Sequence, residues 1–163
     1  MACWRALPAP ASMPLSFATL RRFWNLWPPY LFTGIRVLAI SPDGLYAKVR
    51  LRLHWWNRNA FGTHFGGSLL AMVNPFWPLL VLHRLGRDHI VWDTKNEIEF
   101  VRALREDVFA EFRLDPGAVE DMRAAAAGGE RVLRWFPFEI ASAAGEVAAR
   151  GRIEVYVRRK RDR

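Results

Sequence analysis

Residues that could do chemistry gather in the segment 59–75, NAFGTHFGGSLLAMVNP, where a polar stretch runs into an apolar one. Gly66 and Gly67 open the apolar part. A backbone N–H at the start of a helix has no intrahelical acceptor and carries partial positive charge, so it can stabilise the oxyanion that forms when a carbonyl is attacked. Glycine lets that carbonyl come close to the backbone. The alternative is that the two glycines only permit tight packing of the helix against a sheet.

Attack on a carbonyl also needs a group that accepts a proton, and three residues are candidates for supplying or replacing it. His64 has a suitable unperturbed pKa of about 6.5. Asn74 follows Gly67 by seven residues and cannot take up a proton. It can hold a water or a substrate carbonyl, or it can cap a helix that restarts at Pro75. Asp93 offers a carboxylate if its strand runs beside the helix start. For His64 and Asp93, the alternative is a hydrogen bond within a loop.

The spacing of apolar residues along the chain predicts the helices and strands that must position these residues. Helices are expected at 17–27, 66–85 and 115–129. Ser16 is the N-cap candidate of the first, which Pro28 and Pro29 end. The second is apolar all round and must be bent or split by Pro75 and Pro78. The third starts with Asp115 as N-cap and Pro116 at its first position.

Strands are expected as two segments within 34–53 around a Pro-Asp-Gly turn, and at 89–102, 107–114, 131–140 and 146–158. The last alternates apolar residues with charged ones, and Glu154 lies on the charged side. Strands and helices do not alternate as a doubly wound sheet requires. The order therefore predicts an α+β fold in which an antiparallel sheet wraps around one long central helix.

Composition predicts one domain at residues 14–158, with a loose extension at 1–13 and a basic tail at 159–163. Met13 is an alternative start. The single cysteine, Cys3, fits a reducing, cytoplasmic setting. The longest apolar run, 68–82, is shorter than the roughly 20 residues of a membrane-spanning helix, so no transmembrane segment is predicted. Much of the net charge of +8 is assigned to the tail, either as a solvated end or as a site for RNA or an acidic membrane surface.

No metal or cofactor is predicted, because His54, His83 and His89 lack metal-ligand spacing.

The element order and the glycine pair resemble the hotdog fold, specifically the small thioesterases of the phenylacetate-pathway type. Closer still, GTHFGGSLLAM, GRDHIVWD and YVRRK resemble the bacterial domain of unknown function 4442 family. The thioesterase pattern is Asn, two residues, Gly, two residues, His-Gly-Gly, and a carboxylate seven residues later. Four positions match: Asn59, Gly62, Gly66 and Gly67. Three depart: Phe65 replaces the histidine, Asn74 replaces the carboxylate, and Pro78 replaces a threonine found in some relatives.

The resemblance implies an acyl-CoA thioesterase-like protein that hydrolyses or binds acyl thioesters. Asparagine in place of the carboxylate predicts reduced activity, because loss of a general base typically costs about 10² to 10⁴ in rate. The alternative is a non-catalytic hotdog protein that binds acyl-CoA or lipid, and a third reading is nucleic-acid association through the tail. Catalytic roles are assigned to Gly66, Asn74 and His64. Substrate-binding roles are assigned to Asn59, Gly62, Phe65, Gly67, Asp93 and Arg102, with Arg105 as a further candidate for the phosphates of CoA.

Two further expectations concern partners and the pocket. Hotdog proteins of this type form sites between subunits, so the resemblance implies a homodimer or a homotetramer built as a dimer of dimers, joined through 95–100, KNEIEF. Five aromatic residues could line an acyl tunnel or pack in the core: Trp55, Trp56, Phe65, Phe76 and Trp77.

Overall fold

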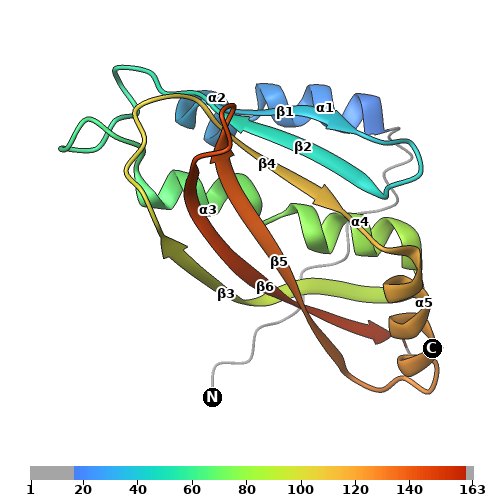
Figure 1. Ribbon diagram of the computed structural model, residues 1–163. Coiled ribbons are helices and arrows are strands. Elements are labelled where there is room, and N and C mark those ends of the chain that lie inside the picture. The colour runs from blue at the N-terminus through green and yellow to red at the C-terminus, as the bar shows by residue number, and fades with distance from the viewer. Residues whose placement is uncertain (1–16, 161–163) are drawn as a thin grey trace, which may run out of the picture.

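The fold is one antiparallel sheet wrapped around a central helical segment, as a computed structural model of the chain shows for residues 17–160 (Figure 1). The predicted extension 1–13 and residues 161–163 of the tail lie outside the described residues. The helices are α1 (Phe17–Leu26), α2 (Pro28–Thr33), α3 (Gly66–Val73), α4 (Phe76–Leu85) and α5 (Pro116–Ala125). The strands are β1 (Ile35–Ile40), β2 (Tyr46–Leu51), β3 (His89–Phe100), β4 (Val108–Arg113), β5 (Val132–Ser142) and β6 (Val147–Arg159).

The six strands lie in the order β1-β2-β4-β5-β6-β3, and every neighbouring pair is antiparallel. This confirms the predicted α+β architecture. The sheet has β1 at one edge and β3 at the other, and α3 and α4 follow one another across its concave side (Figure 1). Their buried side chains meet the inward residues of the strands, as with Met72, Phe76 and Leu80 against Val49 and Phe112.

Gly66–Leu85 is long and apolar enough to cross a membrane by length and composition, the one such stretch within residues 17–160. Half of that stretch is buried inside the fold. Core helices pass the same test, and this one is the helix around which the sheet wraps.

Helix α1 ends at Leu26, just before Pro28 and Pro29, as predicted, but these two prolines have a second role. They begin a second short helix, α2, with proline in its first turn, where the missing N–H has no intrahelical partner to lose. Gly34 ends α2 with a φ of 80°, a conformation that glycine adopts without a Cβ clash. The chain then enters β1 directly. The prediction recognised proline as a helix breaker and overlooked its preference for helix starts.

The last strand alternates as predicted over much of its length, but Ala148 and Glu154 on its charged side are buried. Glu154 lies opposite an irregularity of β3 between Asp93 and Lys95. Thr94, inside that irregularity, donates its hydroxyl to Glu154 Oε2 at 2.6 Å. A carboxylate expected to face water is thus held by the neighbouring strand. β6 itself runs to Arg159, and Lys160 N–H bonds the Asp88 carbonyl at 2.7 Å, so the first residues of the predicted tail are ordered against the fold.

Candidate functional site

A β-bulge in β3 sets which side chains of that strand face the central helix. Asp93 pairs with Val155 and Lys95 with Glu154, so Thr94 is an extra residue without an opposite partner. Val91 and Ile98, seven residues apart, both pack against the core, which an unbroken two-residue alternation would not allow. A bulge re-aims side chains in this way, and bulges are common beside active sites. Asp93 before the bulge and Asn96 after it therefore face the same side.

On that side, Asp93 meets Asn74 at the end of α3. Asn74 donates from Nδ2 to Asp93 Oδ2 at 2.7 Å, and Asn96 Nδ2 donates to the same oxygen at 2.9 Å. Asn74 Nδ2 also lies 3.5 Å from Asn96 Oδ1. Within residues 17–160, no hydrogen bond engages Asp93 Oδ1. Two amides thus fix one carboxylate oxygen and leave the other available, in a half-buried position beside the central helix.

The capping interpretation of Asn74 is wrong. Asn74 has helical backbone angles (φ −51°, ψ −47°) and ends α3, whereas a capping asparagine adopts an extended conformation. Pro75 occupies the N-cap position of α4, and that helix has no side-chain cap. The chain breaks at Asn74 and Pro75 because proline has no N–H to continue the α3 ladder. The side chain of Asn74 is therefore free to reach β3.

The other end of α3 carries the glycine pair. Ser68 N–H and Leu69 N–H both bond the Phe65 carbonyl, and Phe65 provides no side-chain cap. Gly66 and Gly67 N–H therefore have no acceptor within the helix. A Cβ on Gly66 would lie 2.9 Å from the ring of Phe100, at the end of β3. The tight-packing alternative thus has a structural basis, and the oxyanion role of Gly66 stays a prediction.

The loop before α3 is organised by Asn59. Its Oδ1 accepts from Phe61 N–H at 2.9 Å and Thr63 N–H at 3.1 Å, and its Nδ2 donates to the His64 carbonyl at 3.0 Å. Gly62 turns the loop with a φ of 76°. Asn59 and Gly62 therefore shape the approach to the helix, and their predicted contacts with substrate stay untested.

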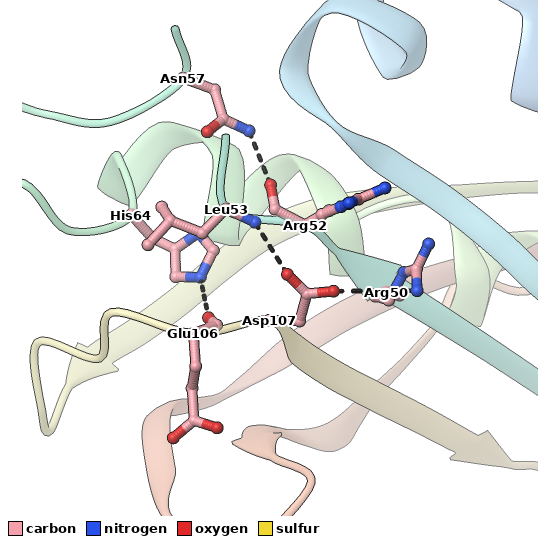
Figure 2. A network of polar contacts seen from close by, with 7 residues as sticks. All are labelled: Arg50, Arg52, Leu53, Asn57, His64, Glu106 and Asp107. Atoms are coloured by element: carbon pink, nitrogen blue, oxygen red, sulfur yellow. Dashed lines mark hydrogen bonds and ion pairs between the residues drawn. The ribbon is translucent and has the colours of Figure 1, made fainter. Parts of the chain in front are cut away.

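His64 is buried at the loop's end and ties it to the residues before β4 (Figure 2). Its Nε2 donates to the Glu106 carbonyl at 2.7 Å. Next to it, Asp107 Oδ1 accepts from Leu53 N–H at 3.1 Å. Burial lowers the pKa of His64, against the opposing effects of the Glu106 carbonyl and the Asp107 charge. The ring nitrogen seen here is thus already engaged with backbone, and the role of His64 as base stays a prediction.

The remaining predicted residues differ in exposure. Arg102 is exposed and pairs with Glu146 at 2.7 Å, an interaction a ligand phosphate could replace at little cost. Arg105 reaches the Phe61 carbonyl at 3.3 Å, so it lies beside the loop that leads into α3. Among the five aromatic residues, Phe76 and Trp77 are core residues, whereas the other three are exposed: Trp55, Trp56 and Phe65.

Sequence reasoning missed Asn96, which donates the second hydrogen bond to Asp93 Oδ2. The only signal lay in the strand pattern. Val91 and Ile98 are seven residues apart, so in one regular strand they would face opposite sides, although both are apolar. That conflict indicates a bulge between them, although not which residue bulges.

A six-stranded antiparallel sheet wrapped around a glycine-opened central helix is the hotdog fold. Solved structures share it across nearly their full length. A Pseudomonas aeruginosa protein of unknown function, described as a probable thioesterase, superposes with a TM-score of 0.78 at 20% identity, covering 91% of this chain and 99% of that one. A thioesterase from Haemophilus influenzae superposes with a TM-score of 0.66 at 14% identity, covering 90% of this chain and 93% of that one. A mutant thioesterase from P. aeruginosa superposes with a TM-score of 0.63 at 13% sequence identity, covering 92% of this chain and 98% of that one.

At these identities the likeness shows the fold. Residues 18–157 match the domain of unknown function 4442 (DUF4442), and the chain belongs to this family. No curated protein matches the chain.

Proposed function

We propose that this protein hydrolyses acyl-CoA or a related acyl thioester, with Asp93 as the general base in place of the carboxylate that similar thioesterases carry at position 74. One observation supports this above the others. Asn74 Nδ2 contacts Asp93 Oδ2 at 2.7 Å, so a carboxylate from β3 stands beside the position whose own carboxylate is missing. Asn74 and Asn96 then act as positioning residues for Asp93.

The proposed step needs only groups of this chain and water. Water attacks the thioester carbonyl carbon, Asp93 Oδ1 accepts the water's proton, and the Gly66 N–H stabilises the oxyanion. The C–S bond then breaks, and the departing thiolate takes the proton, which leaves a free acid and CoA. Exposed apolar side chains near the helix start offer a surface for the acyl chain: Phe61, Phe65, Phe100 and Val101.

Helix geometry argues that one site uses two protomers. Gly66 and Asn74 are eight residues apart at opposite ends of α3, which corresponds to about 12 Å along a helix. A single carbonyl cannot reach the Gly66 N–H and a water on Asp93 of the same protomer. A homodimer in which the helices lie antiparallel would bring the two ends together. The exposed β3 edge, which includes 95–100, is the surface we assign to this pairing. A homotetramer built from two such dimers and a cytoplasmic location stay predictions.

The second candidate function is binding of acyl-CoA or lipid without turnover. The same exposed aromatic surface would hold an acyl chain whether or not a base acts, so binding alone does not separate the two candidates.

The test measures acyl-CoA binding and CoA release over short, long and aromatic acyl-CoAs for the wild type and for Asp93→Asn. We expect the variant to bind as the wild type does and to release CoA about 10² to 10⁴ times more slowly. Asp88→Asn is the matched control, because it removes the same charge from an exposed turn. Binding without release in the wild type would establish the binding function. A wild-type rate in Asp93→Asn would remove Asp93 as base.

A further inference from the structure

An unpartnered apolar surface covers α1 and α2, away from the site. Phe23, Leu26 and Trp27 follow one another at helical spacing and are all exposed, Leu26 at 73%. The opposite side of α1 packs on β1, so this stripe faces outward. In α2, Leu31 and Phe32 are likewise exposed, Phe32 at 71%. Side chains of this size in a row on one face mark a surface that meets something apolar.

Two tryptophans of the 52–65 loop extend this surface. Trp56 donates from Nε1 to the Phe32 carbonyl at 3.2 Å, and its ring stacks on His54. Asn57 fixes the loop further by donating to the Thr33 carbonyl at 2.8 Å. Trp55, at 80% exposure, stands edge-on to Trp56. We define the α1–α2 face as Phe23, Leu26, Trp27, Phe32, Trp55 and Trp56; the hydrogen bonds of Trp56 and Asn57 hold its loop residues against α2.

The part of the sequence that supplies this face is strongly basic. Residues 1–87 contain ten of the 24 Lys and Arg residues but only one of the 16 Asp and Glu residues, Asp43. Their formal charge is +9, whereas that of residues 88–163 is −1 even though the last seven residues alone carry +4. Arg21, Arg22 and Arg36 line a hollow of about 510 Å³ beside α1. Within residues 17–160, none of these three arginines pairs with a carboxylate.

We propose that the α1–α2 face docks this protein on an anionic lipid bilayer. An amphipathic helix with arginines beside a Trp, Phe and Leu surface lies in the plane of the membrane interface, with its apolar side chains in the acyl boundary. Tryptophan is enriched at that depth. Juxtaposed arginines add attraction to anionic headgroups. β1, on which α1 packs, is the sheet edge opposite β3, so docking leaves β3 and the helix that carries Asn74 uncovered.

Other partners fit less of this surface. A second copy would bring two strongly positive halves together. A nucleic acid would match the arginines but not the aliphatic side chain of Leu26, which gains nothing from a phosphate backbone. Both become outcomes of the test.

The experiment measures cosedimentation of the full chain with vesicles of phosphatidylcholine alone and of phosphatidylcholine with phosphatidylglycerol. We expect binding to the anionic vesicles, weakened by salt. Phe23→Ser with Leu26→Ser should lower the partition coefficient about tenfold or more. Arg22→Gln with Arg36→Gln should lower it about tenfold. Because all four side chains are exposed, the thermal midpoint of each variant should match that of the wild type.

Matched changes elsewhere provide the controls. Leu133→Ser removes an exposed leucine from β5, and Arg87→Gln with Arg131→Gln removes two exposed charges outside the α1–α2 face. Both should bind vesicles as the wild type does. Wild-type binding by the Phe23 and Leu26 double variant would overturn the proposal, as would equal loss in the controls. Loss of self-association in that variant would assign the face to a second copy, and RNA binding that depends on the arginines alone would assign it to nucleic acid.

Discussion

At the residue scale, His64 and Asp93 show how two candidate bases acquire different surroundings. His64 is buried, and its Nε2 is used by the Glu106 carbonyl. Asp93 has one oxygen held by two amides and the other free of hydrogen bonds within residues 17–160. A base needs an available lone pair, and the half-buried Asp93 offers one on Oδ1. His64 holds the loop before α3 against Glu106, just before β4, and because its Nε2–H donates, its Nδ1 keeps the lone pair that the predicted role as base would use.

Three histidines with lowered pKa values predict a stability that falls in mild acid. Burial is the main cause that lowers the pKa of His64, His83 and His89. The unfolded chain therefore binds more protons than the folded one between the lowered values and about 6.5, and stability is lost as pH falls through that window. Urea midpoints should be lower at about pH 5.5 than at about pH 7.5. His64→Gln keeps a donor for the Glu106 carbonyl and should flatten part of this dependence. A midpoint unchanged between the two pH values would contradict the account.

At the element scale, the bulge of β3 decides the site, since it turns Asn96 to the side on which Asp93 already faces α3. The bulge is pinned by Thr94, whose hydroxyl bonds Glu154 Oε2 at 2.6 Å and approaches the Glu154 carbonyl at 3.3 Å. A buried carboxylate and an irregular strand thus stabilise each other.

Thr94→Val tests that link. It keeps the shape of the side chain but leaves the buried Glu154 carboxylate without its hydroxyl donor, which typically costs about 1 to 3 kcal/mol. We expect a matching fall in the free energy of unfolding, measured by urea denaturation, and a slower CoA release because Asp93 is less well aimed. Thr94→Ser retains the hydroxyl and should preserve both. Equal values for the valine and serine variants would show that the hydroxyl does not hold the bulge.

At the scale of the whole molecule, the proposed homodimer rests on the length of α3 and on the exposed edge of β3. In that dimer, Gly66 of one protomer and Asp93 of the other would form one site. An experiment that mixes two variants can test this arrangement.

Gly66→Pro and Asp93→Asn form the pair for that experiment. Proline suits the first position of a helix, and Phe65 before it is already extended (φ −69°, ψ 127°), so the change removes the N–H from a compatible backbone. Gly66→Ala is the control, because it adds the same Cβ near Phe100 but keeps the N–H. Each variant by itself should release no CoA. After mixing and exchange of protomers, roughly a quarter of wild-type activity should return, because half of random dimers hold one intact site. No recovery despite exchange would place the site within one protomer.

Much of the fold follows from local patterns in the sequence. The alternation in β2, Asp115 before α5 and the apolar segment that opens at Gly66 each indicate their element, because the period of the apolar residues and the capping chemistry are local properties. The short α2 was missed, since proline both ends and begins helices and only the packing of the following residues decides between the two.

The candidate site depends on contacts that no local pattern contains. The sequence by itself determined the glycine pair, the missing carboxylate at Asn74 and the presence of Asp93 nineteen residues later in the chain. Tertiary structure decided that Asn74 turns to β3 instead of capping α4, that a bulge brings Asn96 to the same side, and that Glu154 is buried. The physical reason is that side-chain direction in a strand depends on register, and one extra residue in β3 reverses it for every residue that follows.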